Sequence, residues 1–177
     1  IPSEVAYFDP QANITVIDID KDLPAIVEEH FLKEPIASNI TFIGEDARGY
    51  LNRNNDTYYD FMFIDAFQGR FVASNLYTIE ALTKFKSASS HIMANVIGRT
   101  SIEHEYTQTL LNNWLSVFGE QAYVVTEAVD DTIRNIVLCN FSCEGSIPLS
   151  MATYLNRDSN IHTDDMPKLD RHYYKSF

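Results

Sequence analysis

The chain has 177 residues, 45% hydrophobic and 21% charged, a composition that excludes a wholly disordered chain and provides for a sizeable core. The formal net charge is −12, from 13 Lys and Arg against 25 Asp and Glu, which leaves too few basic residues for a nucleic-acid-binding face. The acidic balance favours small cationic partners, although many globular proteins are acidic for solubility alone.

Neither targeting segments nor cysteines indicate a function for this chain. The apolar runs are too short to span a bilayer, and no basic segment followed by an apolar stretch opens the chain as a secretory signal would. We therefore expect a cytoplasmic protein. A membrane-spanning half outside this segment is the alternative. Cys139 and Cys143 have no second cysteine pair and no nearby His, so we predict two ordinary thiols and no metal site.

The first half of the chain alternates apolar strand-like runs with stretches that have helical periodicity. The expected elements are a helix ending at Phe8, a strand over Ile14–Asp18, a helix over Leu23–Leu32, a strand over Ile40–Ile43, a short helix over Ala47–Asn52 and a strand over Tyr59–Ile64. One face of the second helix is expected to carry Leu23, Ile26, Val27, His30 and Phe31.

The second half continues this alternation and then changes. The spacing predicts a helix over about Tyr77–Phe85, a strand over His91–Val96 and a long helix over about Ile102–Phe118. Two strand-like runs, Ala122–Glu127 and Ile133–Phe141, then follow without a helix between them, which predicts an antiparallel hairpin. The fold class is therefore α/β, a mostly parallel sheet with a C-terminal antiparallel hairpin.

Three of the predicted strands lead directly into acidic residues, at Asp18, at Asp46 and at Asp65. In an open α/β sheet, ligands bind outside the carboxyl ends of the strands. Carboxylates at those ends can accept hydrogen bonds from ribose hydroxyls, from an adenine amino group or from a reacting amine. The pattern therefore predicts a site for a nucleoside cofactor.

Four segments occur in an order that resembles a known family. They are Thr15-Val-Ile-Asp-Ile-Asp20, Glu45-Asp-Ala-Arg-Gly-Tyr-Leu51, Tyr59-Asp-Phe-Met-Phe-Ile-Asp-Ala-Phe67 and Leu76-Tyr-Thr-Ile-Glu80. Together they resemble the spermidine synthase-like branch of the class I S-adenosylmethionine-dependent methyltransferase superfamily, with its Rossmann-like sandwich. Thr163-Asp-Asp-Met-Pro167 is similar to a tail motif of bacterial spermidine synthase-like proteins, some of which carry a membrane-spanning half.

The resemblance implies a role for individual residues. Asp18, with Ile19 beside it, matches the acid that holds the cofactor ribose, and Asp46 with Ala47 matches the pair that reads adenine. An N-cap of the following helix is the alternative role for Asp46.

On the acceptor side, Asp65 matches the acid that takes a proton from the attacking amine, and we expect this base to be a buried carboxylate. Gln68 and Tyr77 fall on the substrate side, although a core aromatic is an equal alternative for Tyr77.

Two departures from the family pattern bear on function. The chain begins after the place of the family's first strand and glycine-rich loop, so we expect a fragment that binds the cofactor poorly by itself. Spermidine synthases also carry Asp-x-x-Asp, whereas this chain has Asp65-Ala-Phe-Gln68. A neutral amide cannot give a cationic amine the charge-assisted bond that a carboxylate gives, which disfavours putrescine as the acceptor.

The resemblance thus implies S-adenosylmethionine or its decarboxylated form as co-substrate, no metal, and aminopropyl transfer to a small amine in polyamine biosynthesis. The two alternative functions are methyl transfer to a small molecule and a non-catalytic role for a domain of the same fold. A nicotinamide-dependent oxidoreductase is disfavoured because the chain has no Gly-x-Gly-x-x-Gly. We expect a transferase-like domain over residues 1–156, a tail over 157–177, and an assembly such as a homodimer.

Overall fold

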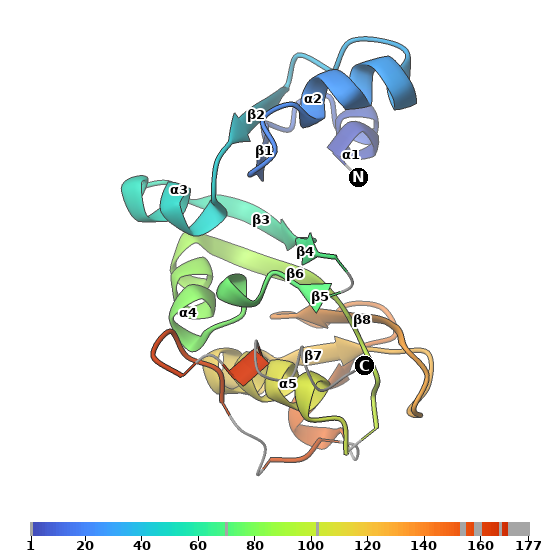
Figure 1. Ribbon diagram of the computed structural model, residues 1–177. Helices are drawn as coiled ribbons and strands as arrows, with labels where there is room; N and C mark the ends of the chain where they lie inside the picture. Colours follow the sequence, from blue (N-terminus) through green and yellow to red (C-terminus); the bar gives the residue numbers. More distant parts are fainter. Residues whose placement is uncertain are drawn as a thin grey trace. The chain divides into compact units, whose positions relative to one another are not determined.

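A computed structural model gives the fold and describes residues 2–69, 71–101, 103–152, 155–157, 161–166, 168 and 169 (Figure 1). The chain divides into two compact units, residues 1–55 and residues 56–177. Each unit has a β-sheet of its own. The predicted boundary between a domain ending at residue 156 and a tail stays a prediction.

The first unit is built around two parallel strands, as the alternating pattern predicts. Its elements are α1 (Pro2–Phe8), β1 (Ile14–Asp18), α2 (Leu23–Ile26) with the π-helical turn η1 (Val27–Leu32), β2 (Ile40–Gly44) and α3 (Ala47–Arg53). The register of β1 and β2 sets Ile14 opposite Ile40 and Asp18 opposite Gly44. Because the strands are parallel, their carboxyl ends lie at the same edge of this sheet.

The face predicted for the second helix is not a buried core face, since Ile26, His30 and Phe31 are all exposed. Phe31 is 76% exposed, and no residue of α2 or η1 is fully buried. The π-helical turn changes the angle between successive side chains, so the 3.6-residue spacing behind the prediction does not hold over Val27–Leu32.

The second unit contains a five-stranded sheet in the order β3-β6-β8-β7-β9. The bounds are Tyr59–Ile64 for β3, Ser89–Gly98 for β6, Tyr123–Val125 for β7, Arg134–Cys139 for β8 and Ile147–Pro148 for β9. A parallel pair, β3 and β6, is joined through a helix, as parallel strands require. The predicted hairpin is confirmed, because β7 pairs antiparallel with β8. Its second strand lies inside the sheet, between β6 and β7.

Short segments follow β3 before the next helix begins. A small antiparallel hairpin is formed by β4 (Phe67–Gln68) and β5 (Phe71–Val72), and the 3-10 turn η2 spans Ser74–Leu76. Gly69 has a φ of 67°, a left-handed conformation that suits the turn between β4 and β5. These segments bring the chain from Asp65 to the buried Tyr77.

Helices α4 (Ile79–Ala88) and α5 (Glu105–Phe118) form the core of the second unit with strand β6. Thr78 caps α4, since its hydroxyl accepts from the Ala81 N–H at 3.1 Å. Along β6, Ile92, Ala94 and Val96 are fully buried and the residues between them are half-buried, as the two-residue period of a strand requires.

Helix α5 is buried around its whole circumference from Tyr106 to Trp114, whereas a helix on the surface of a domain buries one stripe. Buried polar side chains on such a helix need hydrogen-bond partners. Gln108 accepts from the Asn156 N–H at 2.7 Å, and Asn112 donates to the Asn156 carbonyl at 2.7 Å. The chain after the sheet therefore folds back along α5.

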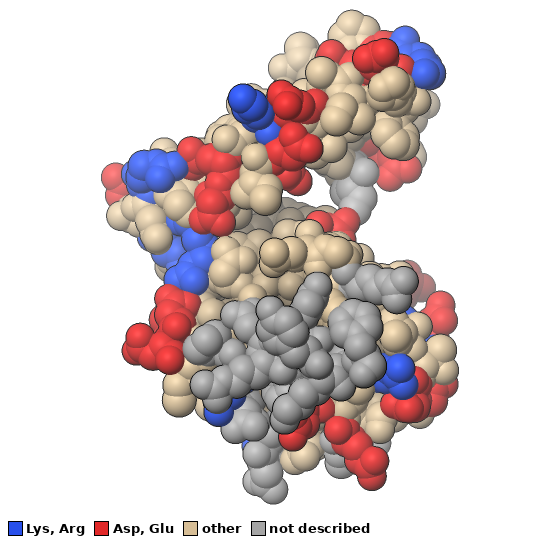
Figure 2. Space-filling model, viewed as in Figure 1, with Lys and Arg blue, Asp and Glu red and all other residues tan. Residues whose placement is uncertain are grey.

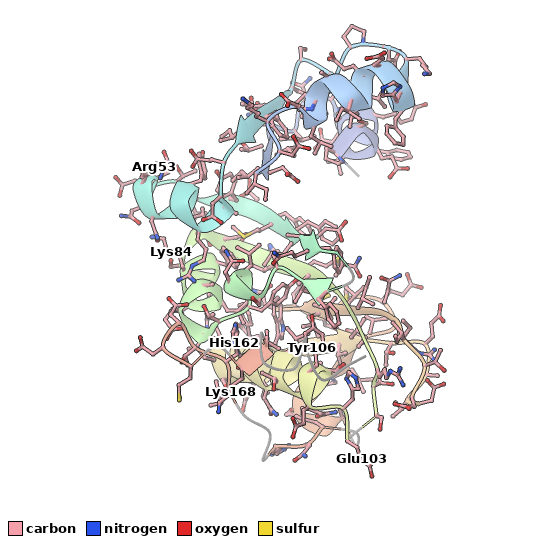
Figure 3. The ribbon with its side chains drawn as sticks, in the orientation of Figure 1. Arg53, Lys84, Glu103, Tyr106, His162 and Lys168 are labelled. Atoms are coloured by element: carbon pink, nitrogen blue, oxygen red, sulfur yellow. The ribbon has the colours of Figure 1, made fainter. Side chains whose placement is uncertain are left out.

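Asn113 on α5 ties three segments together. Its amide nitrogen donates to the carbonyls of Tyr77 and His162, each at 2.7 Å, and its oxygen accepts from the His162 N–H at 2.9 Å. His162 lies beside α5, and a nitrogen of its ring is 3.1 Å from the Ser74 carbonyl (Figure 3). The segment with the Thr163-Asp-Asp-Met motif thereby packs within the second unit; Pro167, the last residue of that motif, lies outside the described residues.

The surface agrees with the acidic composition. On the face drawn in Figure 2, acidic side chains are spread widely and the described basic ones form no broad patch. Among the described helices, none has the length and apolarity that crossing a bilayer requires.

Candidate functional site

The residues predicted to hold the cofactor lie together at the carboxyl edge of the first sheet. Asp18 ends β1 opposite Gly44, and Asp46 follows Gly44 by two residues. Asp18 accepts the Asp20 N–H at 2.8 Å, so the carboxylate holds the turn that leaves the strand. Ile19, next to Asp18, is an apolar side chain that is 78% exposed. This edge offers a carboxylate acceptor beside an exposed apolar surface.

Asp46 takes the N-cap role that the sequence left open. Its side chain accepts the Gly49 N–H at 2.7 Å, and α3 begins at Ala47. The Ala47 N–H belongs to the first turn of the helix, where backbone N–H groups have no partner within the helix. Glu45 forms an ion pair with Arg53 across the same short helix.

Gly44 allows the turn after β1 to approach the end of β2. A Cβ atom at this position would lie 2.8 Å from the Cβ of Lys21, closer than real Cβ atoms approach a neighbour, and 3.1 Å from its Cα. Asp18 and Asp22 border the segment that would have to move.

We expect Gly44→Ala to destabilise the first unit by about 1–3 kcal/mol through overpacking. Hydrogen exchange of residues 14–22 would measure this as faster exchange. Gly49→Ala is the matched control, because a Cβ there meets its nearest atoms at 3.5 Å and alanine favours a helix by up to about 1 kcal/mol. Equal exchange rates in the two variants would contradict the close approach.

The acceptor-side residues form a second cluster, in the other unit. Asp65 follows β3 directly, and one of its oxygens accepts from the side-chain N–H of Asn95 at 2.9 Å. Asn95 lies on β6, next to β3 in the sheet. The prediction of a buried carboxylate is wrong here, since Asp65 is exposed. It lies just beyond the sheet, where β3 has ended after the buried Ile64.

Tyr77 is fully buried, which agrees with the core alternative, and its hydroxyl donates to the Asn95 carbonyl at 3.4 Å. Burial raises the pKa of Tyr77 far above its ordinary value, and the charges of Tyr106 and Asp65 raise it further. The hydroxyl therefore stays protonated at working pH and cannot act as a base. Its contact with Asn95 connects the core to the cluster of Asp65 and Asn95.

Asn95 is the residue that sequence reasoning missed. Its amide oxygen is buried and has no hydrogen-bond partner among the described residues. Leaving a buried acceptor unpaired costs roughly 1–3 kcal/mol, so such a group needs an explanation. The signal in the sequence was a lone Asn within the apolar run Ile92–Ile97.

Gln68 is exposed and pairs with Phe71 in the β4–β5 hairpin. It thus lies three residues after Asp65, where the family's second acid would stand. The cofactor-side residues belong to residues 1–55 and the acceptor-side residues to residues 56–177. That the two sets meet in one pocket stays a prediction, and so do their individual roles. Among the described residues, no group of three or more His, Cys, Asp or Glu could hold a metal ion.

Comparisons with known proteins identify the fold of the chain. The fold is similar to that of a probable spermidine synthase from Corynebacterium glutamicum, with a TM-score of 0.63 and 20% identity over 78% of this chain and 50% of that one. It is also similar to human methyltransferase-like protein 13, solved in complex with SAH, with a TM-score of 0.61 and 16% identity over 98% of this chain and 76% of that one. The fold is therefore the Rossmann-like fold of the class I methyltransferases.

A sequence relationship narrows the class. The chain is 30% identical over 125 residues to a polyamine aminopropyltransferase of Vibrio vulnificus, a match that covers 68% of this chain and 40% of the relative. No family model matches the chain. The chain belongs to the spermidine synthase-like branch of the class I methyltransferase superfamily. The matched segment spans less than half the length of this relative.

Proposed function

We propose that the protein containing this chain transfers an aminopropyl group from decarboxylated S-adenosylmethionine to a small amine, as in polyamine biosynthesis. The observation that carries the proposal is the pair of Asp65 and Asn95 beyond the end of β3. Asn95 holds one carboxylate oxygen and fixes the direction of the other. The named activity of the Vibrio relative supports the same reaction class.

The chemistry assigned to Asp65 is general-base catalysis. An ammonium group has no lone pair, so the acceptor must lose a proton before its nitrogen can attack the methylene carbon beside the sulfonium. The new C–N bond forms as the C–S bond breaks, and the electron pair goes to sulfur, which leaves as a neutral thioether. The proton goes to Asp65.

On the cofactor side, Asp18 would accept from the ribose hydroxyls and Ile19 would pack against the adenine ring. Asp46 would accept from the adenine amino group while it caps α3, since a carboxylate has lone pairs for both. The Ala47 N–H would donate to a ring nitrogen. These assignments rest on the shared edge of β1 and β2 and on the family resemblance.

Gln68 bears on the identity of the acceptor. An amide in place of the family's second acid removes a charge-assisted bond to a cationic amine, worth about 1.5–3 kcal/mol. We therefore propose an amine other than putrescine. The same substitution favours small-molecule methyl transfer from S-adenosylmethionine as the second candidate, and human methyltransferase-like protein 13, with SAH bound, has the same fold.

Product analysis of the full-length protein tests the proposal. Purified protein is incubated with S-adenosylmethionine or its decarboxylated form and a panel of amines, and the nucleoside products are identified by mass spectrometry. Methylthioadenosine supports aminopropyl transfer, whereas S-adenosylhomocysteine supports methyl transfer. If neither nucleoside forms and neither ligand raises the melting temperature, the domain is non-catalytic.

We expect Asp18→Ala to weaken binding of methylthioadenosine by the full-length protein about 10- to 100-fold, because hydrogen bonds to a charged group contribute about 1.5–3 kcal/mol each. Isothermal titration calorimetry would measure the change, with an unaltered circular dichroism spectrum to show that the fold is retained. Asp22→Ala is the control, an acidic residue in the same turn whose backbone N–H bonds to Asp20. Wild-type affinity in Asp18→Ala would refute the ribose assignment.

A further inference from the structure

The two cysteines of the chain lie side by side at one end of β8. Cys139 is the last residue of the strand and is buried, and Cys143 follows it by four residues and is partly exposed. Their sulfur atoms are 2.8 Å apart. Both are free thiols.

This separation is far shorter than an ordinary contact between two atoms that are not bonded. A disulfide needs about 2.05 Å between its sulfurs, so a shift of less than about 1 Å would bring these two within bonding distance. The expectation of two ordinary thiols did not foresee this approach. A spacing of four residues does not by itself bring two thiols together, and the turn after β8 does so here.

Hydrogen bonds fix the backbone on both sides of the pair. Asn140, next to Cys139, donates its N–H to the Ile92 carbonyl at 3.0 Å and accepts the Ile92 N–H on its side chain at 2.6 Å. Cys143 donates its N–H to the Ser146 hydroxyl at 3.0 Å, and the Ser146 N–H returns to the Cys143 carbonyl at 3.0 Å. The folded chain therefore preorganises the two thiols, and an unfolded chain would not.

We propose that Cys139 and Cys143 form a thiol–disulfide exchange site whose co-reactant is a small disulfide such as oxidised glutathione. The Cys143 thiolate attacks one sulfur of the small disulfide, forms a mixed disulfide and releases one small thiolate. The Cys139 sulfur, after loss of its proton, then attacks Cys143 and releases the second small thiolate. Two protein thiols are oxidised and one small disulfide is reduced to two thiols, so atoms and electrons balance.

Exposure decides the order of the two steps. A reagent in solution can reach the partly exposed Cys143, whereas Cys139 is completely buried. Burial raises the pKa of the Cys139 thiol well above its ordinary value, and the neighbouring thiol of Cys143 raises it further. Because the thiolate is the nucleophile, the second step is the slower one and becomes faster as the pH rises.

Mass spectrometry can measure the oxidation state of Cys139 and Cys143 separately from that of any other cysteine. Trypsin cuts after Arg134 and Arg157, and no Lys or Arg lies between them, so one peptide, residues 135–157, contains both thiols. The full-length protein is equilibrated with mixtures of reduced and oxidised glutathione, free thiols are alkylated, and the peptide is weighed. An internal disulfide lowers its mass by two hydrogen atoms, whereas mixed disulfides raise it.

The same protein unfolded in urea is the control, because it has the same thiols without the folded geometry. We expect the folded protein to form the internal disulfide at a ratio of oxidised to reduced glutathione at least about tenfold lower than the unfolded protein needs. An equal ratio in the two states would overturn the proposal. So would a folded protein that collects only mixed disulfides with glutathione.

Two variants test the order of attack. Cys139→Ser is expected to accumulate glutathione on Cys143, because the resolving thiol is missing. Cys143→Ser is expected to stay reduced while folded, because Cys139 is buried. If glutathione labels Cys139 in the folded Cys143→Ser variant as fast as it labels Cys143 in Cys139→Ser, the assigned order is wrong.

Discussion

Replacing Asp65 with Asn in the full-length protein is expected to lower the turnover number about 10²- to 10⁴-fold, which is the usual contribution of a positioned general base. The Kd for methylthioadenosine should change less than about twofold, because the predicted nucleoside contacts belong to Asp18 and Asp46. Asn has the shape of Asp, and its side-chain oxygen can still accept from Asn95. The substitution therefore removes the base and keeps the fold.

Fixed-time assays of product formation would measure the turnover number, and calorimetric titration would measure the Kd for methylthioadenosine. Asp60→Asn is the matched control, since Asp60 is an exposed acid within β3, the strand that leads to Asp65. Asp60→Asn should retain wild-type turnover. An equal loss of turnover and of nucleoside affinity in Asp65→Asn would contradict the role of a base, and unchanged turnover would remove Asp65 from the mechanism.

Loss of the Asn113 side chain should produce the largest change in stability. Asn113→Ala removes three hydrogen bonds, to Tyr77 and twice to His162, and leaves the buried groups of both segments without partners. At about 1 kcal/mol for each bond, the free energy of unfolding should fall by about 3 kcal/mol. Urea denaturation followed by the fluorescence of Trp114, the single tryptophan of the sequence given, would measure it.

The neighbouring residue provides a close comparison. Asn112→Ala removes one hydrogen bond, to the Asn156 carbonyl, so we expect a loss of about 1 kcal/mol. Asn113→Asp should be at least as harmful as Asn113→Ala, because a carboxylate would replace a donor that faces two carbonyl oxygens. If Asn113→Ala and Asn112→Ala are equally stable, Asn113 does not hold the three segments together.

The sequence alone determined the alternation of the elements and the class of the fold. Strand-length apolar runs and helical spacing predicted β1, β2, β3 and β6, and the two runs without a helix between them predicted the pairing of β7 with β8. These signals are local, because each depends only on residues that are close together in the sequence. The acidic residues at the ends of β1, β2 and β3 were equally visible in the sequence. Their position at the carboxyl ends of parallel strands is what indicated a ligand site.

Tertiary structure decided what those residues touch. The order of the strands set Asn95 beside Asp65, and thirty residues of chain separate the two. The burial of α5 on all sides and the tie between Asn113 and His162 also depend on segments remote in sequence. Even Cys139 and Cys143, close in the chain, come together only because Ile92 and Ser146 fix the turn between them. Such contacts follow from packing and long-range hydrogen bonds, which no local pattern of residues specifies.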